Sequence, residues 1–357
     1  MGKWRLLFMK QNLLFYCCLV ASIIMLAFCG RNNQPSENSG PVKIILDTDI
    51  GEDSDDAGAL AVAHALVDFG EAEILAIGTS VNVDYPVLAV DAINTWYGRG
   101  GIPIGTTKSE DAVRWEEAHG DQYSETLAKE YPRTNISWNN ADDAPDVVDV
   151  YRKALADQPD INEKNPGVVI VSIGFKTNMR DLLKSKPCKH SDLPGIKLVE
   201  NKVRLWVPMA KRMDGNRENN IREHPEAAQY AFENWPTPVV ISPYEVGIRI
   251  KSGGALVSLD EDHLIRRAYD LVSWKKALST NGTASFDQSA VLYAVRGING
   301  GPAKDYWDLS EPGHLKVNPD GTTEWNPHED GMQRYLIENR DPDLIADELD
   351  EMMARWP

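Results

Sequence analysis

The sequence predicts an α/β fold in which a mostly parallel sheet carries helices on both faces. Short apolar runs alternate with helix-like segments from residue 42 onward, and this order is typical of parallel strands joined by crossover helices. Acidic and amide side chains gather where the first two apolar runs end, in Asp47–Asp56 and at Asn82. Because ligands bind beyond the carboxyl ends of such strands, these positions predict a functional site at that edge of the sheet.

The first predicted strand is Val42–Leu46, a short apolar run that suits a buried strand. The Ala- and Leu-rich segment Ala57–Phe69 then predicts a helix, and residues 167–173 are the strongest buried-strand signal in the chain. The pair Asp320-Gly321 predicts a β-hairpin over residues 317–323. The other expected elements are strands at 73–79, 102–104, 203–207 and 238–241, helices at 84–97, 143–158, 177–184, 225–234, 287–296 and 342–355, and a loop or short-helix excursion at 108–142.

The first 41 residues predict an export signal and a tether, not part of the fold. A positively charged start, an apolar run over residues 13–28 and then Cys29 give residues 1–29 the layout of a secretory signal peptide. The run is short for a transmembrane helix, which needs about 20 apolar residues. Leu26–Cys29 resembles a bacterial lipobox, although Phe28 stands where a small residue is usual. We expect an exported lipoprotein, with plain secretion and an uncleaved anchor as alternatives, and a flexible tether over residues 30–41.

Charge and cysteine content restrict the partners of the protein. The formal net charge is −17, and so acidic a surface repels nucleic acid and anionic membranes. Contact with a membrane is therefore expected only through a lipid on Cys29, on the periplasmic or cell-surface side. Of four cysteines only Cys188 follows the signal segment, which excludes an intradomain disulfide and a cysteine-based metal site. Residues 42–357 contain no internal repeat and no interdomain linker, so we expect a single domain there.

The segment Asp47–Asp56 (DTDIGEDSDD) holds five aspartates and one glutamate. Neighbouring carboxylates raise one another's pKa unless a cation compensates, and converging carboxylate oxygens suit Ca²⁺, which takes about 6–8 oxygen ligands. Gly51 gives the turn freedom to wrap around an ion. Taken alone, the segment is also compatible with a solvated acidic loop. An EF-hand is excluded, because Glu52 and Gly58 occupy its glycine and glutamate positions.

Five segments in the right order resemble the inosine–uridine-preferring nucleoside hydrolase family, from residue 42 to about residue 300. The first, Asp47–Asp56, resembles the family signature Asp-x-Asp-Pro-Gly-x-Asp-Asp, with Ile50 in place of proline and two residues inserted before the last Asp pair. The resemblance implies a nucleoside-hydrolase-like fold with a Rossmann-like open sheet. The other four segments are Thr79–Asn82 (family Val-Ala-Gly-Asn), Ile173–Asn178 (Gly-Pro-Leu-Thr-Asn), Glu218–Ala228 (Glu-Phe-Asn…Asp-Pro-Glu-Ala-Ala) and Ser285–Val291 (His-Asp…Ala-Val).

The resemblance also implies a calcium ion held by three aspartates and one main-chain carbonyl, which by position are Asp49, Asp56, Asp287 and the carbonyl of Ile173. Asp49 would further act as the catalytic base that accepts a proton from the attacking water. Attack at the anomeric carbon would break the N-glycosidic bond through an oxocarbenium-like transition state. The implied substrate contacts are Asp55, Asn82 and Asn220 to ribose hydroxyls and Glu218 to the 5′ hydroxyl.

Two departures from the family pattern bear on catalysis. Phe286 stands where the best-known branch of the family has a histidine that helps to protonate the leaving base. A phenylalanine could stack on a base, although core packing is its more common use. Met209–Asn216 replaces the Gly-Gly…Gly-Asn segment expected before Glu218. The sugar-binding half of the implied site therefore matches the family less closely than the metal-binding half.

The leading hypothesis is calcium-dependent hydrolysis of ribonucleosides to ribose and a free base. One alternative is a non-catalytic or repurposed lipoprotein that binds ribose or nucleosides. Another is a phosphatase of the haloacid dehalogenase type, because Asp47-Thr48-Asp49 follows a first strand as Asp-x-Asp. That chemistry leaves Glu218 and Asp287 without a function. The resemblance also implies a homo-oligomer.

Overall fold

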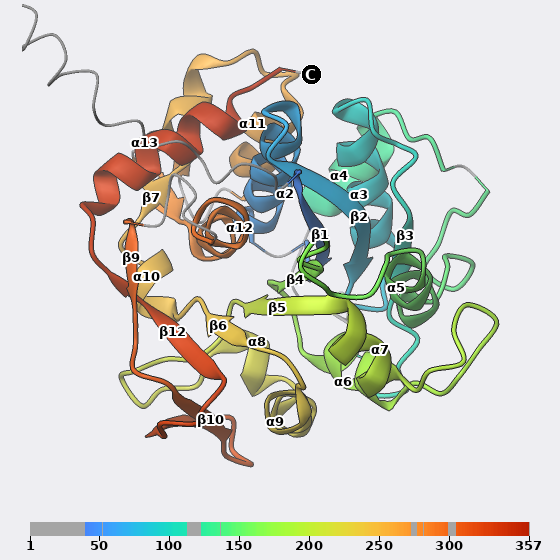
Figure 1. Ribbon diagram of the computed structural model, residues 1–357. Coiled ribbons are helices and arrows are strands. Elements are labelled where there is room, and N and C mark those ends of the chain that lie inside the picture. Colours follow the sequence, from blue (N-terminus) through green and yellow to red (C-terminus); the bar gives the residue numbers. More distant parts are fainter. Residues whose placement is uncertain are drawn as a thin grey trace, which may run out of the picture. The chain divides into compact units, whose positions relative to one another are not determined.

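In the part of the chain that the computed structural model describes, the central sheet has ten strands (Figure 1). Nine of them are ordered β11-β10-β12-β6-β5-β4-β1-β2-β3, and β9 pairs with β12. The structure describes residues 40–356 except 52, 113–122, 136, 273–276, 281 and 299–304. All of these residues belong to one compact unit, residues 39–357. The predicted signal over residues 1–29, with Cys29, and most of the predicted tether lie outside the described residues. Within the described part, no helix is both long and apolar enough to span a bilayer.

The middle of the sheet is parallel, as the sequence predicts. β1 lies between β2 and β4, and parallel pairing continues through β5 and β6 on one side and β3 on the other. β1 and β4 read as continuous apolar runs because both of their faces are covered by helices. The six strands are β1 (Val42–Thr48), β2 (Ala72–Thr79), β3 (Ile104–Thr106), β4 (Val168–Ser172), β5 (Val203–Pro208) and β6 (Val239–Ile241).

Two hydrophobic cores flank this sheet, because side chains alternate along each strand. Ile44 and Leu46 of β1 pack into one core, whereas Ile45 packs into the other. Figure 1 shows α2 and α12 on one side of the sheet and α5, α6 and α7 on the opposite side. The first core includes α2 (Asp55–Asp68), α3 (Asp84–Trp96), α4 (Tyr123–Glu130), α11 (Leu264–Leu271), α12 (Phe286–Arg296) and α13 (Pro342–Met353). The second includes α5 (Val147–Ala156), α6 (Thr177–Lys184), α7 (Gly195–Lys202) and α9 (Pro225–Asn234).

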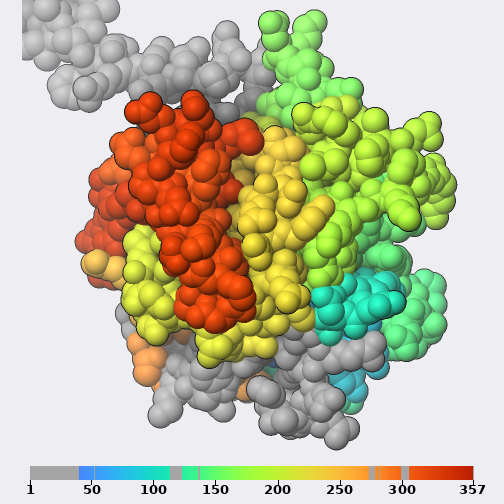
Figure 2. All heavy atoms as spheres, turned by 90° about the horizontal axis from the view of Figure 1, so that it is seen from below, coloured from blue at the N-terminus to red at the C-terminus, as the bar shows by residue number. Residues whose placement is uncertain are grey.

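The predicted hairpin is confirmed: β10 (Gly313–Val317) pairs antiparallel with β11 (Thr323–Pro327). Gly321 has a φ of 83°, a backbone conformation that favours glycine in the turn. The chain then adds β12 (Gln333–Glu338), which extends the parallel sheet next to β6. Figure 2 shows this orange-red segment packed beside the yellow part of the chain, and α9 contacts β10. The sequence did not predict β12 or its antiparallel neighbour β9 (Trp307–Leu309).

Several short elements also escaped prediction. The excursion expected over residues 108–142 contains α4, and its residues 113–122 lie outside the described part. Four further elements are only two to four residues long, too short to show a clear period in the sequence. They are α8 (Asn219–Arg222), α10 (Tyr244–Gly247), and the strands β7 (Lys251–Ser252) and β8 (Thr283–Ala284), which pair with each other. The eight-residue helices α7 and α11 were not predicted either.

Candidate active site

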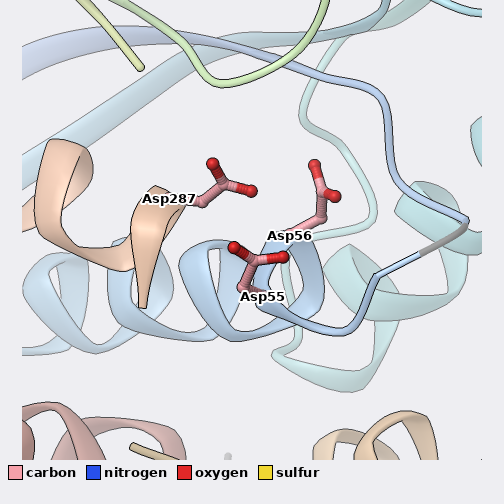
Figure 3. A group of neighbouring side chains, drawn as sticks. All are labelled: Asp55, Asp56 and Asp287. Atoms are coloured by element: carbon pink, nitrogen blue, oxygen red, sulfur yellow. The ribbon is translucent and has the colours of Figure 1, made fainter. Parts of the chain in front are cut away.

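Three buried carboxylates meet at the carboxyl edge of the sheet. Asp55 and Asp56 lie in the first turn of α2, and Asp287 lies in the first turn of α12. One oxygen from each lies within 4.8 Å of the other two. Figure 3 shows the three side chains directed toward a common space between the two helix starts. Carboxylate oxygens that converge in this way are the ligands that hard divalent cations take in proteins.

Local sequence explains why the two helix starts come together. Gly51 has a φ of 149°, which allows the chain to turn sharply between β1 and α2. The hydroxyl of Thr48 donates to Asp56 and accepts the backbone N–H of Ile50, so it ties the end of β1 to the first turn of α2. A Cβ on Gly58 would lie 2.6 Å from Nε2 of Gln288 on α12. The absence of that side chain therefore permits close packing of α2 on α12.

Asp49 and Asp47 lie beside this group. Burial raises the pKa of Asp49 to about 8, and the charge of Asp49 in turn raises the pKa of Asp56. Oδ2 of Asp47 accepts hydrogen bonds from Oη of Tyr151 (2.6 Å) and Nδ2 of Asn178 (2.7 Å). Burial raises the pKa of Asp47 to about 6. Because Asp47 is fully buried and held on both sides, the geometry disfavours it as the nucleophile of a phosphatase.

The electrostatics of the group fit a divalent cation. Burial raises the pKa of both Asp56 and Asp287 well above the ordinary range of an aspartate. The charges of Asp49 and Asp55 raise these two pKa values further. Buried like charges are costly unless a counter-ion compensates them. A cation with two positive charges and a preference for oxygen ligands would remove this repulsion, so the residues present fit such an ion.

The main chain after β4 lies next to the same edge. The N–H of Ile173 donates to the carbonyl of Asp47 (2.7 Å), and the carbonyl of Ile173 accepts Nδ2 of Asn220 (2.6 Å). The N–H of Asn220 donates to Oε1 of Glu218 (3.0 Å), which caps α8. Burial raises the pKa of Glu218 to about 7. Within the described residues, Oε2 of Glu218 is buried without a hydrogen-bond partner. Since buried polar atoms are normally paired, this oxygen is a candidate acceptor for a donor on a ligand.

The predicted site residues thus fall on one edge of the sheet, though not all in one group. Asp55, expected as a ribose contact, lies among the three converging carboxylates, whereas Asp49 lies outside that group. Asn82 is half-buried three positions after the end of β2, which neighbours β1. Asn220 is buried and joins Ile173 to Glu218.

Two features were missed in the sequence. The ring of Phe286 stacks on Tyr244 (centroids 5.1 Å apart, planes at 24°), and the guanidinium of Arg212 lies 3.7 Å from the Tyr244 centroid. No sequence pattern joins these three residues. The second feature is Lys176, which is fully buried although lysine is rarely so. The sequence did indicate that position 176 is buried, because Lys176 stands where the family segment Gly-Pro-Leu-Thr-Asn has leucine.

Comparison with known proteins identifies the family. A family model described as "Inosine-uridine preferring nucleoside hydrolase" matches residues 44–341. The chain belongs to this family. As a member of this family, the protein is a hydrolase that acts on N-glycosyl bonds, and its substrates belong to the class of small-molecule nucleosides. No curated protein matches the sequence.

Solved structures of low sequence identity share the fold of this nucleoside hydrolase. An inosine–guanosine nucleoside hydrolase is 16% identical, with a TM-score of 0.62, and the match covers 88% of this chain and 99% of the other. A purine-preferring ribonucleoside hydrolase from Gardnerella vaginalis is 17% identical, with a TM-score of 0.64 and coverage of 87% and 98%. The type III effector protein XopQ, solved with adenosine diphosphate ribose, is 15% identical, with a TM-score of 0.64 and coverage of 88% and 94%. These matches confirm the predicted fold class.

Proposed function

We propose that this nucleoside hydrolase cleaves ribonucleosides in a calcium-dependent reaction that releases ribose and a free base. The observation that carries the proposal is the convergence of three buried carboxylates from two helix starts within 4.8 Å. Such a group is costly to bury without a cation. Calcium suits it better than magnesium, because calcium tolerates irregular oxygen geometry and magnesium demands a near-octahedral shell.

By the family pattern, the proposed cation ligands are Asp49, Asp56, Asp287 and the carbonyl of Ile173. Asp55, the third member of the converging group, lies beside them as a proposed ribose contact. When bound, the cation would hold ribose hydroxyls and a water molecule together and would favour loss of a proton from that water. The burial that raises the pKa of Asp49 also makes this carboxylate a stronger base than an exposed aspartate. We assign Asp49 as the group that accepts the proton of the attacking water.

Sugar recognition in this proposal uses acceptors and amides already arranged at the same edge. Oε2 of Glu218 would accept a hydrogen bond from the 5′ hydroxyl, and Asp55 from a ribose ring hydroxyl. Asn82 and Asn220 would contact further ribose hydroxyls. Fixed contacts of this kind hold the anomeric carbon near the water, and the surrounding carboxylates stabilise the positive charge that develops on the sugar.

The leaving base must depart without an imidazole beside Asp287, because Phe286 occupies that position. The ring of Phe286, the residue before Asp287 in the chain, instead stacks on Tyr244. This arrangement favours substrates whose base leaves readily by itself. It also supports the second candidate function, a ribose- or nucleoside-binding protein without turnover.

We further propose that residues 1–29 direct export, that Cys29 carries a lipid, and that residues 30–41 tether a single domain to the membrane surface. The motivation is the signal-like layout of the N-terminus. Metabolic labelling with a fatty acid, in the wild type and in Cys29→Ala, tests the lipid. Equal labelling of both proteins would exclude Cys29 as the lipidated residue.

A panel of purine, pyrimidine and nicotinamide ribonucleosides tests the enzymatic function, with released ribose as the readout. We expect release that stops with a chelator and returns with calcium. We also expect a loss of at least about 100-fold in Asp49→Asn, but none in the exposed Asp157→Asn. No release across the panel would refute the hydrolase proposal for ribonucleosides. Calcium-dependent binding of nucleosides without release would favour the binding protein.

A further inference from the structure

Lys176 is a buried amine that the proposed reaction does not use. It lies at the N-cap of α6, four positions after the end of β4, and its side chain is fully buried. Burial lowers the pKa of Lys176, whereas the charges of Glu218, Asp47 and Asp49 favour its ammonium form. A buried amine is costly unless its donors are satisfied. The location of its hydrogen-bond acceptors therefore indicates what it does.

Nζ of Lys176 donates to two main-chain carbonyls, those of Ser172 (3.3 Å) and Gly174. These two residues flank Ile173, whose carbonyl instead accepts Nδ2 of Asn220 (2.6 Å). The middle carbonyl thus has a different partner from its two neighbours. Lys176 holds the two neighbouring carbonyls, whereas the carbonyl of Ile173 is bound by Asn220.

The same segment is fixed at its N–H groups. The N–H of Ile173 donates to the carbonyl of Asp47 (2.7 Å), and the N–H of Phe175 donates to Oγ of Ser80 (3.0 Å). The carbonyls of Ser172 and Gly174 share peptide planes with these two N–H groups, so Lys176 holds the second end of each plane. The plane between them carries the Ile173 carbonyl, and its N–H, that of Gly174, donates to the carbonyl of Asp47 at 3.3 Å. With both flanking planes held, rotation of this middle plane is restricted, and with it the direction of the Ile173 carbonyl.

We propose that Lys176 is a positioning residue for the cation site, which holds the carbonyls of Ser172 and Gly174 and so fixes the direction of the Ile173 carbonyl. This inference rests on the proposed function, in which that carbonyl is a cation ligand. The family segment has leucine at this position, so a hydrogen-bonding clamp here is a property of this chain. Groups that orient metal ligands typically change metal affinity by about 10–100-fold when removed.

Charge repulsion alone and the proposed positioning role predict opposite changes in cation affinity when Lys176 is replaced, so one measurement distinguishes them. An ammonium near a cation site repels the cation, so its removal alone should strengthen binding. If Lys176 orients a ligand, its removal should weaken binding. Lys176→Met keeps an unbranched side chain that is one atom shorter, and it removes both the charge and the donors. The matched control is Lys211→Met, which removes a buried amine that lies over the ring of Tyr335 instead of on these carbonyls.

The experiment measures Ca²⁺ binding by calorimetry and Tb³⁺ binding by luminescence, both without substrate. We expect Lys176→Met to bind each ion at least about tenfold more weakly than the wild type, with Lys211→Met unchanged. Affinity in Lys176→Met that equals or exceeds that of the wild type overturns the inference. If Lys176→Met does not fold, Lys176→Leu, which carries the residue of the family segment at this position, decides by the same criterion, because it too lacks both the charge and the donors. A wild type that binds neither ion refutes the proposed cation site itself, and the inference with it.

Discussion

Asp56 and Asp287 are 231 positions apart in the sequence, yet their carboxylate oxygens lie within 4.8 Å of each other. Each occupies the first turn of a helix, and α2 packs directly on α12. Gly58 favours this pairing, because a Cβ there would lie 2.6 Å from Nε2 of Gln288 on α12 and 2.4 Å from Oη of Tyr269. Because this helix packing brings two buried carboxylates close together, it also makes the site costly to form without a cation.

Asp287→Asn should have opposite effects with and without calcium. Without calcium, removal of one buried charge relieves repulsion, so the melting temperature should rise. With calcium, loss of a ligand should weaken binding at least about tenfold and reduce the stabilisation that the ion provides. Thermal melts in chelator and in a calcium series measure both effects. The control Asp157→Asn, at the exposed C-cap of α5, should change neither. A calcium response equal to that of the wild type in Asp287→Asn would contradict the assignment.

Phe286→His should restore protonation of the leaving base. A positioned imidazole typically contributes about 10²–10⁴-fold to such a step, and we expect at least about a tenfold rise in kcat for substrates with a poorly leaving base. The rise should be greatest near and below pH 6.5, where an ordinary imidazole carries its proton. Phe286→Leu is the control, because it also removes the stack on Tyr244. A histidine variant no faster than the leucine variant at any pH would refute this explanation of the departure.

Gly174→Ala should disturb the Asp-rich turn. A Cβ at Gly174 would lie 2.4 Å from Oγ of Ser80 and 2.7 Å from the backbone nitrogen of Asp49. Since backbone cannot move aside cheaply, we expect a loss of about 1–3 kcal/mol in the free energy of unfolding, together with weaker calcium binding. Urea denaturation and calcium titration measure the two effects. Gly101→Ala is the matched control, because a Cβ there meets no atom within 4 Å, and equal behaviour of the two variants would contradict the prediction.

His64 should make the protein sensitive to acid. It is fully buried in α2, stacks on Tyr97 (4.6 Å), and shares a hydrogen bond with Oδ1 of Asn94 (2.9 Å). Burial lowers its pKa to about 3. The folded state therefore excludes a proton that the unfolded chain binds at about pH 6.5, so this contribution to stability is complete above pH 6.5 and is lost as the pH falls toward 3.

The measurement for His64 compares the free energy of unfolding at pH 7 and pH 4.5 in the wild type and in His64→Gln. The decrease between these pH values should be smaller in the variant by about 2 kcal/mol. Titration of carboxylates is common to both proteins and cancels in the comparison. The exposed His314→Gln should retain the wild-type decrease. An identical decrease in His64→Gln would show that His64 does not titrate in this range.

Much of the fold could be predicted because apolar runs of strand length stand out wherever both faces of a strand are buried. β1 and β4 are such runs, and the helices between them have helical length and composition. β12 was missed because its sequence, QRYLIE, mixes polar and apolar residues near the edge of the sheet, where packing partners come from distant strands. α8 and α10 are only four residues long, and so short a segment cannot display a helical period.

The sequence by itself determined the parallel sheet, the acidic character of its carboxyl edge and the family to which the chain belongs, since these follow from local patterns and ordered motifs. Tertiary structure decided which carboxylates converge, because only the packing of α2 on α12 brings Asp287 to Asp56. It also decided that Lys176 is buried with its amine on two carbonyls, whereas an isolated lysine in a sequence predicts an exposed charge. Distances between residues far apart in the chain depend on packing in three dimensions, and a linear pattern carries no direct measure of them.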